Sequence, residues 1–203
     1  MLYVCCGLPR CGKSSFADVW VNCRHKRVIV AGDDIRLALT GQRYLHCAEE
    51  VVHTTKHLMI KSLLIRGHHV LHDGTNTTLE SIHKMEEIAK ITGNRLIFVL
   101  FNTNKKECIY RAENSNQYDL VPVIEEMSNN LPQTHRYIQD NYENREDIAI
   151  INASELNQKN YYIGHNLTNS TYDTITTFGD VSCQHDYNTN VIRINNDNSI
   201  YSV

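Results

Sequence analysis

Short runs of consecutive apolar residues alternate along the chain with longer segments in which apolar residues recur every three or four positions. The runs lie at residues 2–6, 27–31, 69–73, 95–101 and 147–151, and their length and composition predict β-strands. The run at 95–101 is apolar on both faces, as expected of a central parallel strand. Strands that alternate with helical segments predict a parallel sheet with helices on both of its faces.

The segments between the runs predict helices. One begins at Ser14, and the others cover residues 35–39, 48–66, 79–91, 104–114 and 121–130. Gly41, Gly67 and Gly93 follow three of these segments, where glycine commonly ends a helix. For the segment at 48–66, the spacing predicts a buried face made of Val51, Val52, Thr55, Leu58, Met59, Ser62 and Leu63.

The turn between the first strand and the first helix carries a motif. Residues 7–14 read G-x-x-x-x-G-K-S, a loop whose backbone N–H groups surround phosphate oxygens at the N-terminus of a helix. Gly7 and Gly12 are expected to supply backbone angles closed to other residues. Lys13 is predicted to reach the β- and γ-phosphates, and Ser14 to ligate Mg²⁺. The predicted nucleotide-binding set is Gly7, Leu8, Pro9, Arg10, Cys11, Gly12, Lys13, Ser14 and Ser15.

This motif predicts a nucleoside triphosphate as partner, with ATP and Mg²⁺ as the expected cofactors. Together with the alternation of strands and helices, it predicts a P-loop NTPase of kinase type. The expected architecture is a three-layer α/β/α fold with a five-stranded parallel sheet and a short lid. Ligands of such sheets bind at the carboxyl ends of the strands, so the polar residues at those ends are the candidates for chemistry.

Two adjacent carboxylates, Asp33 and Asp34, follow the second strand. Asp33 is predicted to accept the proton of an acceptor hydroxyl as a catalytic base, with Asp34 on the acceptor side. The alternative is that both carboxylates only cap the following helix. Arg36 is predicted to clamp a phosphate of the acceptor; the alternative is an arginine in solvent.

Asp73 ends the third apolar run, in a pattern typical of the strand whose aspartate supports Mg²⁺ in P-loop enzymes, so Asp73 joins Ser14 as a predicted metal ligand. Thr75 and Asn76, in the turn that follows, are candidate acceptor contacts. Arg111 precedes the polar segment 115–120. It either brings positive charge from a lid to the phosphates or stabilises the end of its own helix.

Composition narrows the classes of protein further. The chain has 203 residues, 41% of them hydrophobic, which suits one α/β domain at 1–152. The Asn-, Thr- and Ser-rich residues 153–203 form either a loosely structured tail or a small β appendage. This segment carries the whole formal net charge of −3, so a broad duplex-binding surface is not indicated. No apolar run is long enough to cross a membrane.

Seven cysteines without the spacing of a disulfide framework indicate reduced thiols and a cytoplasmic protein. His53 and His57 are four residues apart on a predicted helix, but the glutamate of a zinc-protease motif is missing. Ordinary surface histidines are therefore expected there. The sequence does not predict an oligomeric state.

Taken together, these motifs resemble those of the polynucleotide 5′-kinases of bacteriophages and, more broadly, of the zeta toxins and small ATP-dependent kinases. The motifs are the loop at 7–14, G-D-D-I-R at 32–36, V-L-H-D-G-T-N at 70–76 and C-I-Y-R at 108–111 before Val121-Pro122. The resemblance implies that Asp33 is the general base, that Arg36 contacts the acceptor's phosphate and that Asp73 supports the site. Asn116 stands where the family carries its lid arginine, and Arg111 is the arginine available.

The leading hypothesis is therefore transfer of the γ-phosphate of ATP to a hydroxyl of a nucleic acid, most simply a 5′-OH end. A second hypothesis keeps the chemistry and changes the acceptor to a nucleoside, sugar, antibiotic or modified base. A third is a nucleotide-binding module without catalysis. The paired carboxylates favour an enzyme, because a module that only binds needs no base for an acceptor.

Overall fold

The computed structural model describes residues 1–22 and 25–142 with their side chains, and the backbone of five strands between residues 148 and 195. The strands are β1 (Leu2–Cys6), β2 (Arg27–Ala31), β3 (His69–Asp73), β4 (Leu96–Phe101), β5 (Ile148–Ile151), β6 (Ile163–Leu167), β7 (Thr171–Asp180), β8 (Gln184–Asp186) and β9 (Val191–Asn195). The helices are α1 (Lys13–Asn22), α2 (Gly32–Thr40), the 3₁₀ turn η1 (His46–Ala48), α3 (Glu49–Ile65), α4 (Leu79–Thr92), α5 (Lys105–Asn114) and α6 (Leu120–Tyr142).

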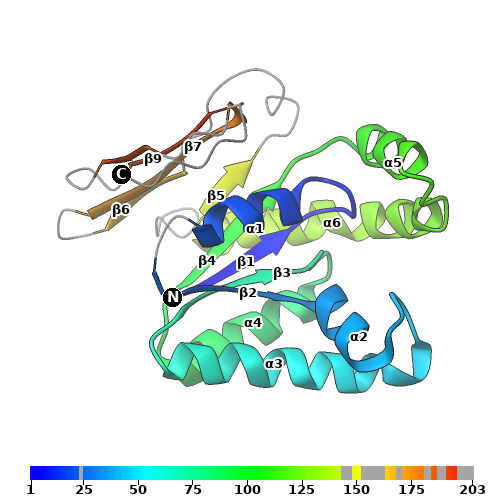
Figure 1. Ribbon diagram of the computed structural model, residues 1–203, viewed down its shortest axis with the longest axis horizontal. Coiled ribbons are helices and arrows are strands. Elements are labelled where there is room, and N and C mark those ends of the chain that lie inside the picture. The colour runs from blue at the N-terminus through cyan, green and yellow to red at the C-terminus, as the bar shows by residue number, and fades with distance from the viewer. Residues whose placement is uncertain are drawn as a thin grey trace.

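The predicted α/β class with a parallel sheet is confirmed. The strand order is β2-β3-β1-β4-β5, and every neighbouring pair is parallel. The arrowheads of β1 and β3 point toward the side of the molecule where α2 lies (Figure 1). The loop after β1, the start of α2 and the turn after β3 therefore share the carboxyl edge of the sheet, where α/β folds bind ligands.

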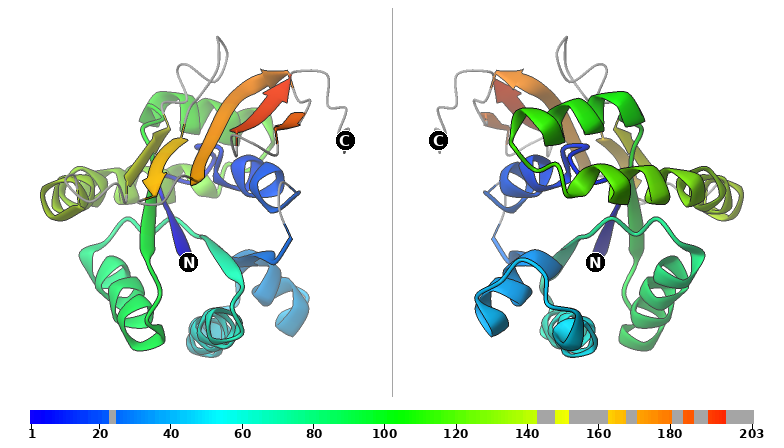
Figure 2. Two further views of the ribbon diagram at one scale, coloured as in Figure 1. Left: turned by 90° about the vertical axis from the view of Figure 1, so that its left-hand side faces the viewer. Right: turned by 90° about the vertical axis from the view of Figure 1, so that its right-hand side faces the viewer.

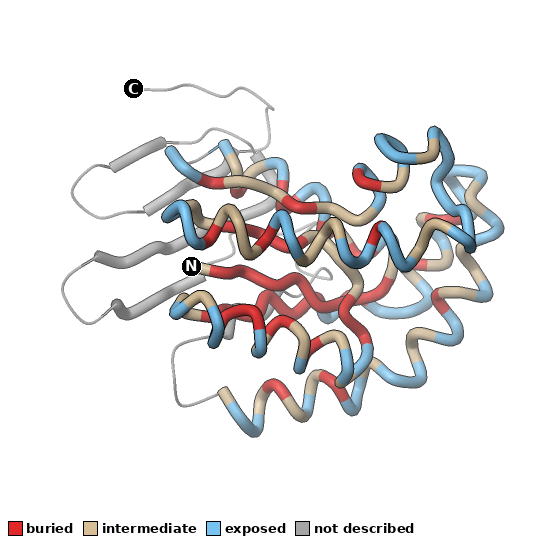
Figure 3. The backbone as a smooth tube through the Cα atoms, turned by 90° about the horizontal axis from the view of Figure 1, so that it is seen from below, coloured by how far each residue is buried: buried red, intermediate tan, exposed pale blue. Residues whose placement is uncertain are grey.

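The core consists of two apolar clusters on opposite faces of the sheet, because successive side chains of a strand point in opposite directions. One cluster joins Tyr3 and Cys5 of β1 to α1, α5 and the start of α6. The other joins Leu2 and Val4 to α2, α3, α4 and the end of α6. Figure 2 shows α1 on one side of the strands and α3 and α4 on the other. Buried residues follow the strands and the inner faces of the helices (Figure 3).

Two predicted helices begin or end elsewhere. Helix α2 begins at Gly32 instead of near residue 35, and it ends at Gly41 in the left-handed conformation that glycine favours. Helix α6 continues to Tyr142, well past the predicted end at residue 130, with Pro132 inside it. Residues of α6 beyond Pro132 still pack into the core, since Ile138 is fully buried. Tertiary packing therefore extends this helix beyond its proline, which costs one backbone hydrogen bond.

The predicted buried face of α3 is correct at Val52 and wrong at most other positions. The helix buries Val52, Ile60 and Leu64, whereas Leu58 is 62% exposed and Val51 is 55% exposed. Apolar residues occur all around α3, so their spacing does not select one face. The face that packs is instead chosen by how the helix lies against β2, β3 and α4.

Strands β6 to β9 pair into a second sheet in the order β6-β7-β9-β8. They lie within residues 153–203, the segment for which the sequence leaves a loose tail and a β appendage open. The division of the chain at residue 152 stays a prediction. Within the described ranges, every helix is too short or too polar to cross a lipid bilayer.

His72, in the middle layer of the fold, makes stability depend on pH. Its ring is buried, with Nδ1 3.2 Å from the carbonyl oxygen of Val30. Burial, and then the charge of Lys56, lower its pKa to about 3. In the unfolded chain His72 is protonated below about pH 6.5, whereas in the folded chain it stays neutral down to about pH 3. The free energy of unfolding therefore decreases as the pH falls below about 6.5.

We expect His72 to reduce the free energy of unfolding by about 2 kcal/mol between pH 7 and pH 5, at 1.36 kcal/mol per unit of pKa shift. Equilibrium denaturation at the two pH values measures this loss. The variant His72→Gln has no titrating ring at this position and should lose less stability than the wild type. An equal loss in both proteins would contradict the assignment.

Candidate nucleotide-binding and catalytic site

The loop between β1 and α1 has the glycine requirements of a phosphate-binding loop, for two different reasons. Gly12 has φ 109° and Arg10 has φ 64°, angles at which glycine is the residue least strained. Gly7 is required for space instead: a Cβ there would lie 2.7 Å from the Cβ of Phe101 and 2.8 Å from the Sγ of Cys11. The expected backbone role is thus confirmed for Gly12, whereas at Gly7 the constraint is close packing.

Neighbouring strands hold this loop from both sides. The N–H of Gly7 donates to the carbonyl of Thr75, after β3, at 2.9 Å. The buried hydroxyl of Thr103, after β4, donates to the carbonyl of Cys11 at 2.9 Å. Both contacts come from residues far along the chain, so the loop is shaped before any ligand arrives. No motif of the sequence marks Thr103 for this role.

Lys13 is the first residue of α1, and its side chain is folded over the loop. Its Nζ donates to the carbonyls of Leu8 at 2.6 Å and Gly7 at 3.2 Å, and it lies 3.6 Å from the Sγ of Cys11. The side chain is largely buried, at 7% exposed. The ammonium group therefore stands within the turn that the sequence predicts to hold phosphates.

The two predicted metal ligands lie together. The hydroxyl of Ser14 hydrogen-bonds the carboxyl group of Asp73. Burial raises the pKa of Asp73 above its ordinary value, while Ser14 and Lys13 lower it and the charges of Asp33 and Asp34 raise it further. A hydroxyl and a carboxylate are hard oxygen ligands of the kind Mg²⁺ prefers, so the donor set fits this ion.

Arg36 is held between two carboxylates. Its Nε and Nη2 donate to Glu49 at 2.7 Å each, and its Nη1 donates to Asp33 at 2.6 Å. Burial opposes the charge of the guanidinium, but the Glu49 contact dominates and raises the pKa of Arg36. Because a guanidinium has five N–H donors, two of them remain for a further anion. Arg36 is therefore not the solvated arginine of the alternative interpretation.

Glu49, the first residue of α3, is the part of this cluster that the sequence analysis missed. It lies thirteen residues after Arg36, and its contact with Arg36 lowers its pKa. The two hydrogen bonds from the Arg36 guanidinium to the two carboxylate oxygens of Glu49 fix the plane of the guanidinium. Nothing in the sequence separates Glu49 from its neighbour Glu50, which is exposed.

Asp33 and Asp34 do not cap α2. The N-cap residue is Ala31, without a side-chain hydrogen bond, and both carboxylates lie in the first helical turn. Neighbouring residues of a helical turn project about 100° apart, so the two carboxylates point in different directions. Both are exposed, Asp33 with 85% of its side chain accessible. They remain open to an acceptor from solvent.

The turn after β3 is mainly structural. Asn76 is buried and donates from Nδ2 to the carbonyl of Cys5 at 2.7 Å, while the thiol of Cys6 donates to the carbonyl of Asn76 at 3.1 Å. These bonds join β1 to the turn. The carbonyl of Thr75 is engaged with Gly7. Acceptor contacts by Thr75 and Asn76 stay predictions.

Arg111 of α5 reaches the phosphate-binding loop. Its Nε donates to Glu107 at 2.7 Å, and its Nη1 lies 3.4 Å from the carbonyl oxygen of Arg10. The guanidinium thus contacts a side chain of α5 and the loop, and the loop contact favours the interpretation as a lid cation. Its action on phosphates stays a prediction.

Comparison with known proteins gives the family of this domain and similar folds. The family model of the AAA domain matches residues 2–133. A chain of the Pnkp1/Rnl/Hen1 complex is 27% identical over 54% of this chain, with a TM-score of 0.51. A chain from a second structure, of the Pnkp1/Rnl/Hen1 RNA repair complex, is 23% identical over 67% of this chain, with a TM-score of 0.61. The present chain spans 38% and 45% of those two chains.

A further similar structure comes from the PezAT chromosomal toxin–antitoxin system of Streptococcus pneumoniae. It is 17% identical over 76% of this chain and 67% of its own, with a TM-score of 0.61, which is a likeness of fold. No curated protein matches the sequence. The family match covers more than half of the chain and includes the loop, Asp33 and Asp73. The chain therefore belongs to the AAA domain family, with a domain of P-loop kinase type.

Proposed function

We propose that this protein transfers the γ-phosphate of ATP to the 5′-hydroxyl end of a nucleic acid. The observation that carries the proposal is that two groups of residues lie together at the carboxyl edge of the sheet: the phosphate-binding loop with Asp73, and the aspartates at the start of α2. Asp73, hydrogen-bonded to Ser14, lies near enough to Lys13, Asp33 and Asp34 for their charges to change its pKa. A base for an acceptor thus stands beside the residues suited to the triphosphate, which an enzyme needs and a binding module does not.

In the proposed reaction, the loop at 7–14 holds the triphosphate and Lys13 moves its ammonium from loop carbonyls to phosphate oxygens. Asp33 takes the proton of the acceptor hydroxyl while the oxygen attacks the γ-phosphorus. The bond from that phosphorus to the β–γ bridging oxygen breaks, and ADP leaves. Arg111 adds positive charge near the transferred group. Mg²⁺, held by Ser14 and Asp73, would neutralise charge on the phosphate oxygens.

Arg36 supports the nucleic-acid acceptor in particular. Glu49 and Asp33 orient its guanidinium, and two N–H groups remain free to bind a phosphate next to the reacting hydroxyl. The similarity to a chain of an RNA repair complex agrees with such an acceptor. The direct test is transfer of label from γ-labelled ATP to 5′-OH oligonucleotides, with nucleosides and sugars tested in parallel. Label on uncharged small molecules alone would favour the second hypothesis.

The variant Arg36→Ala is expected to raise the KM for an oligonucleotide about 10- to 150-fold, with the KM for ATP nearly unchanged. The reason is the loss of a charged contact worth about 1.5–3 kcal/mol to the acceptor. Steady-state kinetics with each substrate varied in turn measures the effect. Because Arg36 also holds Asp33, kcat should fall as well.

The control for Arg36 is Glu49→Gln, which leaves the guanidinium in place and removes the negative charge of its main partner. It should raise the oligonucleotide KM less than Arg36→Ala does. Added salt should weaken oligonucleotide binding by the wild type, and less steeply in Arg36→Ala. An Arg36→Ala enzyme with an unchanged oligonucleotide KM would contradict the phosphate-binding role.

A further inference from the structure

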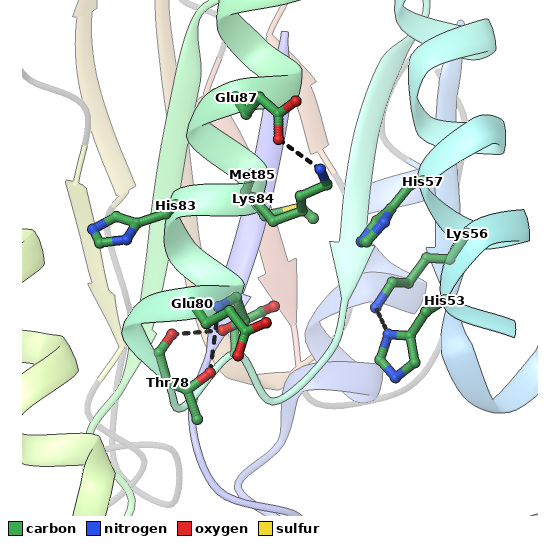
Figure 4. Close-up of a pocket in the computed structure, with 11 residues that line it drawn as sticks. His53, Lys56, His57, Thr78, Glu80, His83, Lys84, Met85 and Glu87 are labelled. Atoms are coloured by element: carbon green, nitrogen blue, oxygen red, sulfur yellow. Dashed lines mark hydrogen bonds and ion pairs between the residues drawn. The ribbon is translucent and has the colours of Figure 1, made fainter. Parts of the chain in front are cut away.

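A groove of about 870 Å³ lies between α3 and α4, beside the candidate catalytic cluster. His53, Lys56 and His57 project into it from α3, and Lys84 and Glu87 project from α4 on the opposite wall, whereas His83 points away (Figure 4). Both helices begin at the carboxyl edge of the sheet, so one end of the groove opens at that edge. None of these five wall residues is used in the reaction proposed above.

A chain of polar contacts connects the groove to the candidate base. Asp33 contacts Arg36, and Arg36 contacts Glu49. Glu49 Oε2 then lies 3.9 Å from His53 Nε2, and His53 Nδ1 lies 3.3 Å from the Nζ of Lys56. A nucleic-acid strand with its 5′-hydroxyl end at Asp33 and its first phosphate at Arg36 would enter the groove directly.

Lys56 is the residue of the groove that most resembles an anion ligand. Among the residues with described side chains, no carboxylate lies within 4 Å of its Nζ. Burial, and then the charge of Arg36, lower its pKa. The charge of Glu49 raises this pKa, but from beyond 4 Å. By contrast, Lys84 is paired with Glu87 at 2.6 Å. A sheltered ammonium without a directly paired carboxylate is costly in the free protein, and a bound phosphate reduces that cost.

The two histidines of α3 suit the remaining parts of a nucleotide. Burial and then Lys56 lower the pKa of His53, and the same two causes, in the same order, lower that of His57 to about 4. Both rings are therefore neutral at pH 7, able to stack on bases and to share hydrogen bonds with sugars. The α3 wall of the groove thus offers one positive group and two flat polar rings, the pattern of a single-strand site, while the α4 wall carries Lys84 and the carboxylates of Glu80 and Glu87.

We infer that the groove between α3 and α4 holds the acceptor strand beyond its reacting end, with Lys56 binding a second backbone phosphate. This inference rests on the function proposed above and extends it, because it assigns an acceptor of at least two phosphates. A nucleoside 3′-monophosphate would fill only the position at Arg36. A longer 5′-OH strand would also reach Lys56, His53 and His57.

The test compares a nucleoside 3′-monophosphate with 5′-OH oligonucleotides of increasing length and otherwise equal sequence. For the wild type, KM should fall about tenfold or more once the acceptor carries a second phosphate, as for one charged hydrogen bond. In Lys56→Ala this gain should disappear, while Lys56→Arg should keep most of it. Lys84→Ala should reduce the gain less, because its ammonium is already paired.

Lys90→Ala, on the exposed end of α4 outside the groove, controls for the loss of one positive charge. Thermal unfolding of each variant checks its fold, and Lys56→Gln, which keeps an aliphatic stem, replaces Lys56→Ala if that protein unfolds. Transfer that shows no dependence on length, or the same dependence in Lys56→Ala or Lys56→Gln as in the wild type, would overturn the groove assignment alone. No transfer to any oligonucleotide by the wild type would overturn the proposed function and this assignment with it.

Discussion

The variant Lys13→Met is expected to lower kcat for phosphate transfer by about 10²–10³-fold or more, the cost of removing one preorganised donor from developing negative charge. The ammonium of Lys13 already lies within the loop, on the carbonyls of Gly7 and Leu8, so its path to a bound triphosphate is short. Methionine keeps the length of the side chain but cannot donate. Transfer of labelled γ-phosphate and direct ATP-binding titrations measure the two consequences.

Lys105→Ala is the matched control for Lys13→Met. Lys105 opens α5, is exposed and has no place in the proposed reaction. Its loss should leave turnover within the experimental spread. A Lys13→Met protein that turns over at the wild-type rate would remove the basis for nucleotide binding at this loop, whatever the acceptor.

The second large effect is expected from Asp33→Asn, which should lower kcat about 10²–10⁴-fold, as for loss of general-base catalysis. The amide is close in shape to the carboxylate, and its oxygen can still accept from Arg36. ATP binding should therefore be nearly unchanged. Because 85% of the Asp33 side chain is exposed, thermal unfolding should shift little, and the loss can be assigned to chemistry.

Asp34→Asn provides the comparison in the same helical turn. Asp34 is exposed like Asp33, but Arg36 contacts Asp33 and not Asp34, so its replacement should cost much less in kcat. The reverse ranking would show that the two carboxylates have exchanged roles. Equal, small effects would argue against a base at the start of α2.

Much of the fold follows from local patterns. The five apolar runs become strands because each is short, apolar and bounded by turn residues. Gly41 and Gly93 end their helices in the left-handed conformation that glycine adopts without strain. The loop motif identifies Lys13 and Ser14 by spacing alone, and the parallel sheet then brings Asp33 and Asp73 to the same edge.

The contacts that complete the site are not local, and the sequence therefore does not reveal them. Glu49 meets Arg36 across two helices, and Thr103 meets Cys11 across ninety-two positions. Pairings of this kind depend on how helices lie on the sheet, and helical periodicity carries no information about them. The same reason explains the wrong face of α3 and the unpredicted groove, since both arise where α3 packs against α4.

The contacts of Lys13 with its own loop also affect the thermodynamics of nucleotide binding. A lysine side chain that moves freely loses up to about 2 kcal/mol of rotamer entropy when a ligand fixes it. Here the two carbonyl bonds fix that side chain as the protein folds. Binding then exchanges carbonyl oxygens for phosphate oxygens around an ordered cation, so a larger share of the interaction energy appears as affinity for the triphosphate.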